Sequence, residues 1–311
     1  MAHGHRGVKP LLVNRYEKVT HQLLTTAAAD NGDELWAKVR LADVIDEAGY
    51  TGRLKQYALS AHLDFVMVDP ATSLPRFAVE FDGKQHFTDH VTRERDRLKD
   101  TLCLKAELPL LRITSEYTRT QGRWTILSYV VEGFYHSLAF FEAQERGYIP
   151  LDEPYDFGNV IATGEDGRLL FNTLDAATRL HLLELHKANH LPSFCPDVYL
   201  TANATEGSVD AHAFMAVARD RYLIGRTRLR DCRFQGVSPH EIAEQLAVVE
   251  VGALADQWLA GQPAACNGAT LAKSMEKVQQ AIDTGGLLSV TGGGALRAGG
   301  PLPVTITIQH P

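Results

Sequence analysis

Two neighbouring segments, HLDFVMV and RFAVEFD, carry the residue types best suited to phosphoester chemistry in this chain. Both segments are rich in β-branched and aromatic residues, which predicts two strands. Because strand residues alternate between faces, Glu80, Asp82 and Lys84 are expected to point the same way, and Asp64 lies near the start of the preceding strand. If the two strands pair as a hairpin, three carboxylates converge at one end of a sheet.

Converging carboxylates repel one another and raise their pKa values unless a cation lies among them. Hard oxygen ligands favour Mg²⁺ or Mn²⁺, which take one or two carboxylates together with water and substrate phosphate. Such an ion lowers the pKa of a bound water and neutralises charge that develops on a phosphodiester. Lys84 could orient that water, and His86 could assist near the scissile phosphate as a neutral imidazole or a proton donor.

The elements that would position these residues alternate between helix and strand. A helix is expected over residues 14–29 and a strand over 35–44, followed by a loop that ends at Gly49. After the two strands already described come an amphipathic helix over 87–107, a short strand over 109–113 and a long helix over 124–144. The first 150 residues therefore predict an alternating α/β unit.

Several of these motifs occur in an informative order. Asp-Phe in one strand precedes Glu-x-Asp-Gly-x-x-His at the end of the next, and a helix with Arg-x-x-Asp precedes the strand LLRI. This order resembles the PD-(D/E)XK nuclease superfamily, in its branch of restriction-endonuclease-like domains related to very-short-patch-repair endonucleases. The resemblance covers about residues 12–115. Glu17 matches the acidic residue that this superfamily often carries on its first helix, and KVRLADVI resembles the first strand region of that branch.

The resemblance implies a restriction-endonuclease-like core, which is a mixed sheet flanked by helices, and a metal-dependent endonuclease that hydrolyses DNA. It makes Asp64 and Glu80 ligands of Mg²⁺ or Mn²⁺, with Asp82 as a third carboxylate. The lysine of the superfamily would fall at position 82, where this chain has aspartate. Either Lys84 replaces that lysine, or the acting triplet is Asp82-Gly83-Lys84.

The helix after the second strand offers basic residues on one broad face. Arg93 and Lys99 are six residues apart, with Asp96 between them, so the three share that face. In nucleases of this kind the corresponding helix borders the site and contacts phosphate. The alternative interpretation is a solvated helix face without a ligand.

The remaining chain predicts a second, smaller domain. We expect a nuclease domain over 12–147, an α+β domain over 155–262 and a Gly-rich C-terminal extension over 263–311. The order α-β-β-β-α within 176–258 resembles a double-stranded-RNA-binding domain. The second helix begins with Pro-His-Glu instead of the lysines with which that family grips phosphate, so a protein-interaction or dimerisation module is the competing interpretation.

Two further patterns in this region have alternative interpretations. Arg226, Arg228 and Arg230 alternate along one strand, so they could follow the phosphates of a nucleic acid or form a solvated sheet face. His186 and His190 have the spacing of zinc ligands, and Cys195 follows, but no fourth ligand is evident.

Composition narrows the function class. The net charge is −7, so the chain is not a globally basic nucleic-acid binder, although a local basic face stays open. No apolar run is long enough for a membrane helix, and no signal-peptide core is evident, so we expect a cytoplasmic protein without membrane contact.

Together with these observations, the resemblance implies an Mg²⁺- or Mn²⁺-dependent endonuclease that acts in restriction, repair or anti-phage defence, as many nucleases of that superfamily do. Its substrate is DNA, or alternatively RNA or a hybrid, and its second domain recruits a protein partner or a second copy of the chain. The alternative is a catalytically inactive nucleic-acid-binding or protein-interaction module that retains the nuclease fold.

Overall fold

The computed structural model divides the chain into two compact units. The first comprises Met1–Tyr155 and Cys232–Val237, and the second comprises Asp156–Asp231 and Ser238–Pro311. The structure describes residues 15–83, 89–121, 124–157, 161–163, 169–171, 173–203, 207–234, 237–292 and 295–299.

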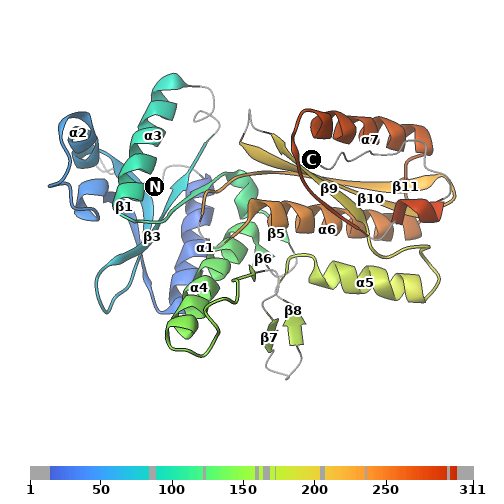
Figure 1. The fold of residues 1–311 in the computed structure, drawn as a ribbon, viewed down its shortest axis with the longest axis horizontal. Coiled ribbons are helices and arrows are strands. Elements are labelled where there is room, and N and C mark those ends of the chain that lie inside the picture. The colour runs from blue at the N-terminus through green and yellow to red at the C-terminus, as the bar shows by residue number, and fades with distance from the viewer. Residues whose placement is uncertain are drawn as a thin grey trace, which may run out of the picture. The chain divides into compact units, whose positions relative to one another are not determined.

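A four-stranded mixed sheet forms the centre of the first unit (Figure 1). Its order is β1-β2-β3-β4, with antiparallel pairing of β1 with β2 and of β2 with β3, and parallel pairing of β3 with β4. The strands are β1 (Glu34–Arg40), β2 (His62–Val68), β3 (Pro75–Phe81) and β4 (Leu110–Ile113). The helices are α1 (Arg15–Asn31), α2 (Gly52–Ser60), α3 (His90–Lys105) and α4 (Ile126–Glu145). Shorter elements are the 3₁₀ turns Leu41–Asp43 and Ser115–Thr118 and the strand pair β5 (Thr120–Gln121) and β6 (Trp124–Thr125).

Helices cover both faces of this sheet because both faces of its central strands are apolar. Ala78 joins the buried cluster that includes Leu102 of α3. Its neighbour Phe77 points the other way and packs edge-on against Phe134 of α4 and Phe234. The segment Cys232–Val237 thus completes the core on the α4 side, although it comes late in the chain.

The second unit is a three-layered α/β arrangement. Its antiparallel sheet has the order β11-β10-β9-β12. The strands are β9 (Asp197–Asn203), β10 (Ser208–Ala218), β11 (Arg221–Arg230) and β12 (Leu287–Thr291). The helices are α5 (Ala176–Lys187), α6 (Pro239–Leu259) and α7 (Gly268–Asp283). A small hairpin of β7 (Ile161–Thr163) and β8 (Leu169–Phe171) and a 3₁₀ turn at Ala295–Gly299 complete it.

Alternation along β10 and β11 explains the layers of the second unit. Phe214 and Tyr222 share a buried cluster with Met275 of α7. Gly225 faces α6 so closely that an added Cβ would lie 2.3 Å from the carbonyl oxygen of Ala247. Helices α6 and α7 therefore lie on opposite faces of the sheet, as Figure 1 shows.

The expected α/β class is confirmed, and the order α-β-β-β-α appears as α5-β9-β10-β11-α6. Two expectations differ from the structure. Helix α2 occupies part of the stretch between the first two strands, for which no helix was expected. Residues 263–311 do not stand apart as an extension where they are described, because α7 and β12 pack and pair within the second unit. Among the described helices, none is long and apolar enough to cross a membrane.

Candidate active site

Lys38 lies where α1, β1 and β2 meet. It has a φ of +56°, in the left-handed region that non-glycine residues rarely adopt. Its Nζ lies 3.1 Å from Oε1 of Glu17 and 2.6 Å from Oδ1 of Asp64. Partial burial lowers the pKa of Lys38, but the hydrogen bonds and charges of Asp64 and Glu17 outweigh it and raise that pKa above its ordinary value. A permanent cation therefore lies between two carboxylates from different elements.

The adjacent strand contributes a third carboxylate. The backbone N–H of Asp64 donates to Oε1 of Glu80 at 3.0 Å, and that of Phe81 donates to Oδ2 of Asp64 at 2.9 Å. Nζ of Lys99, on α3, donates to Oε2 of Glu80 at 2.6 Å and to the carbonyl oxygen of His62 at 2.8 Å. We call Glu17, Lys38, Asp64, Glu80 and Lys99 the carboxylate–lysine cluster.

Glu80 is the most perturbed carboxylate of this cluster. Its side chain is only 6% exposed. Burial raises the pKa of Glu80 to about 7, against the attraction of Lys99, and the nearby negative charge of Asp64 acts in the same direction as burial. A buried carboxylate that changes its protonation near neutral pH is a feature typical of functional sites.

Asp82 belongs to a different set of contacts. Both of its carboxylate oxygens accept hydrogen bonds from Arg112, at 2.9 Å each. The same guanidinium lies 2.6 Å from Oδ1 of Asp96 and 2.8 Å from Oδ1 of Asp100, both on α3. Glu80 and Asp82 both make ion pairs on the α3 side of the sheet, as alternation predicts, but each has its own cation. The expected convergence of Asp64, Glu80 and Asp82 is therefore not what the structure shows.

The oxygen donors of the cluster are of the type that a hard divalent ion prefers. The available ligands are the carboxylates of Glu17, Asp64 and Glu80. The ammonium of Lys38 already lies between the first two of them, where a metal cation would otherwise lie. Across the described part of the chain, no three histidine, cysteine, aspartate or glutamate side chains are arranged to hold a metal ion as they stand. Mg²⁺ needs only one or two protein carboxylates, so the chemistry of the donor set suits it, while Lys38 and Lys99 pair with these carboxylates in the structure as it stands.

Other expected site residues fall elsewhere. Lys84 and His86 lie outside the described residues. Arg93 is exposed on α3, whereas Lys99 is 9% exposed and bound to Glu80. Because burial and the ion pair withdraw the ammonium of Lys99 from solvent, the alternative of a solvated helix face does not apply to it, and its expected contact with phosphate stays a prediction.

The arginines of the second unit are engaged with their neighbours. Arg226 donates to Oγ of Ser274 on α7 at 2.5 Å, and Arg228 pairs with Asp210 on β10 at 2.5 Å. Helix α7 covers part of the sheet face on which these arginines lie. Arg230 follows at the end of β11.

The proposed zinc ligands of the second unit are not gathered around a metal position. Nδ1 of His186 lies 2.9 Å from the carbonyl oxygen of Leu191. No group of three potential ligands forms in this or any other described part of the chain.

Two cations of the site were missed by sequence reasoning. The sequence pattern of β1 does not identify Lys38 as a site residue, because the direction of its side chain depends on an unusual positive φ. Arg112 carried a usable signal, since an arginine within the apolar strand LLRI must find buried partners.

A family of proteins of unknown function, DUF2726, matches residues 9–128, which contain the whole carboxylate–lysine cluster. Comparisons with curated proteins and with solved structures give no match.

Proposed function

We propose that the first unit is a PD-(D/E)XK-type hydrolase of phosphodiester bonds in DNA, with its centre at the carboxylate–lysine cluster. The carrying observation is that Glu17, Asp64 and Glu80, from a helix and two strands, gather around two lysines at one end of β2 and β3. The sheet order β1-β2-β3-β4, with only β3 and β4 parallel, supports the fold that the sequence motifs suggest.

Asp64 and Glu80 would hold Mg²⁺ or Mn²⁺, with Glu17 next to them. When bound, this ion would activate a water molecule and neutralise charge on the phosphate. Lys99 keeps the buried Glu80 carboxylate in position through a 2.6 Å contact. Lys38, held between Glu17 and Asp64, supplies a positive charge where phosphate negative charge would accumulate.

The position of Lys38 also suggests why the lysine expected after Glu80 is dispensable. At position 82 the chain has an aspartate, and that aspartate neutralises Arg112. Two lysines reach the carboxylates from β1 and α3 instead. The charge that the superfamily places on one strand is thus offered here by two other elements.

A cleavage assay on supercoiled plasmid tests this proposal. We expect the wild-type chain to nick or linearise plasmid with Mg²⁺ or Mn²⁺ but not with EDTA, and Asp64→Asn to abolish cleavage. Asp30→Asn is the matched control. It makes the same chemical change at an exposed position near the end of α1, outside the cluster. Equal cleavage by Asp64→Asn would contradict the assignment of the site.

The alternative function is a non-catalytic nucleic-acid or protein module. The ion pairs at Lys38 and Lys99 favour it, because they satisfy the carboxylates without a metal. Absence of cleavage by wild type with either metal, on single-stranded, duplex and hybrid substrates, would favour this alternative.

A further inference from the structure

A polar groove lies between α2 and α3, beside the carboxylate–lysine cluster. Its volume is about 530 Å³, and its lining includes Arg53, Tyr57, His62, Arg95 and Lys99. None of its lining residues is acidic. A groove without acidic residues is notable in a chain with a net charge of −7.

The two helices that form the groove are the source of its positive charge. Helix α2 carries two basic residues and no acidic residue, and α3 carries five basic and three acidic residues. Two of those three acids, Asp96 and Asp100, bind Arg112 at the sheet. The third, Glu94, pairs with Arg53 at the surface. Little negative charge is thus left to oppose an anion between the helices.

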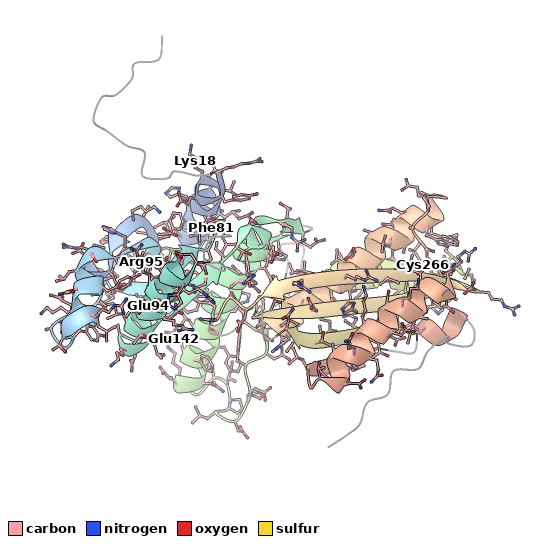
Figure 2. All side chains as sticks on the ribbon, turned by 90° about the horizontal axis from the view of Figure 1, so that it is seen from above. Lys18, Phe81, Glu94, Arg95, Glu142 and Cys266 are labelled. Atoms are coloured by element: carbon pink, nitrogen blue, oxygen red, sulfur yellow. The ribbon has the colours of Figure 1, made fainter. Side chains whose placement is uncertain are left out.

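Arg95 is the cation that is best placed to receive a ligand. It is exposed on α3, where Figure 2 labels it next to Glu94. Among the described residues, its guanidinium has no ion-pair partner. A guanidinium donates several hydrogen bonds in a planar fork that matches phosphate oxygens.

The groove borders the proposed catalytic centre. Lys99 lines the groove with its side chain and binds Glu80 with its ammonium. His62 lines it two residues before Asp64 on β2. Burial raises the pKa of the Tyr57 hydroxyl to about 12, and the negative charges of Glu80 and Asp96 act in the same direction. Tyr57 therefore stays protonated and can donate a hydrogen bond.

We infer that the α2–α3 groove binds the phosphate backbone of a nucleic-acid strand and leads it to the carboxylate–lysine cluster, with Arg53 and Arg95 as the principal phosphate contacts. This inference rests on the proposed function, because it names the path of the substrate of that site. It also assigns a role to α2, which joins β1 to β2 and takes no part in the cluster itself.

Binding in EDTA tests the groove separately from cleavage. The probe is a fluorescein-labelled DNA oligonucleotide, as a single strand and as a duplex, titrated with the full chain and followed by fluorescence anisotropy at several NaCl concentrations. For Arg53→Gln/Arg95→Gln we expect affinity to fall about tenfold. The salt slope, log Kd against log[NaCl], should decrease by about 1.8 for duplex or about 1.4 for single-stranded DNA, which also distinguishes the two forms.

The matched control is Lys105→Gln/Arg146→Gln. It removes the same charge from exposed positions of the first unit outside the groove, and Arg146 pairs with Glu142 as Arg53 pairs with Glu94. The control should bind like wild type. A second groove variant, Gln56→Glu, adds an acid to the lining and should also weaken binding.

The outcomes separate the two proposals. Unchanged affinity and salt slope in Arg53→Gln/Arg95→Gln and in Gln56→Glu, with wild type bound, would overturn the groove even if the chain cleaves DNA. Equal loss in the control variant would also overturn it, since the effect would then be one of net charge alone. No binding of wild type to either DNA form would overturn it as well. Loss confined to the groove variants would support the groove even if the chain cleaves nothing.

Discussion

The raised pKa of Glu80 predicts that this residue makes the folded chain less stable as pH rises, which is opposite to the usual effect of a paired carboxylate. Its pKa is raised from 4.5 to about 7 in the folded chain, chiefly by burial. The folded state therefore holds a proton that the unfolded state has already released, and stability falls as pH rises between these two values. At 1.36 kcal/mol per pKa unit, we expect this carboxylate to remove about 3 kcal/mol of unfolding free energy between about pH 5 and pH 8.

Glu80→Gln isolates this contribution, because the amide keeps the shape of the side chain and does not titrate near neutral pH. On going from about pH 5 to pH 8, wild type should lose about 3 kcal/mol of unfolding free energy that Glu80→Gln does not lose, so the variant becomes more stable relative to wild type by that amount. Glu145→Gln, at an exposed position of α4, controls for the chemical change and should show no such trend.

Urea unfolding in EDTA, followed by tryptophan fluorescence, measures this difference. Trp36 and Trp124 belong to the first unit and Trp258 to the second, so a Trp258→Phe background reports the first unit only. A difference between Glu80→Gln and wild type that does not change with pH would refute the reasoning. It would mean that Lys99 keeps Glu80 ionised throughout, and that attraction outweighs burial at this pair.

Two further predictions concern buried contacts. Arg112→Met should destabilise the first unit by about 3–5 kcal/mol in the same urea assay, because it leaves Asp82 without its buried cation, and a loss below about 1 kcal/mol would contradict the role given to this arginine. Gly225→Ala should destabilise the second unit by about 1–3 kcal/mol, read from Trp258 fluorescence, because its Cβ would collide with the backbone of α6. Gly49→Ala, in open space in the first unit, is the control for the substitution itself and is read in the Trp258→Phe background; an equal destabilisation by both substitutions would refute the close approach of β11 to α6.

Much of the first unit could be predicted because its strands are strongly patterned. HLDFVMV became β2 over the predicted residues, and the helix after the second strand differs from α3 by only a few residues. Helix α2 was missed because its sequence, GRLKQYALS, has only one fully buried residue, so periodicity gives little signal. An element was thus predicted where its apolar pattern was strong, and the prediction failed where the pattern was weak.

The candidate site was only partly predictable for a different reason. Alternation placed Glu80 and Asp82 on one side of the sheet, which the structure bears out, but alternation does not say which cation each carboxylate meets. Asp82 met Arg112, from a strand that is parallel to its own and far along the chain. Lys38 contacts Asp64 from a left-handed backbone conformation, which lysine rarely adopts and which the sequence therefore does not predict.

The late segment Cys232–Val237 has a consequence for biosynthesis. Phe234 packs on Phe77 and Phe134, and Arg233 lies 3.0 Å from Asp100, so the first unit includes residues made after most of the second unit's sheet. At the usual rate of translation, about 5–20 residues per second, residues 156–231 take roughly 4–15 s to synthesise. While residues 156–231 are being synthesised, a nascent chain that already contains the first unit up to Tyr155 therefore exposes the Phe77–Phe134 surface. Chaperones that bind exposed aromatic surface have their opportunity on the ribosome, before the chain can close its own first core.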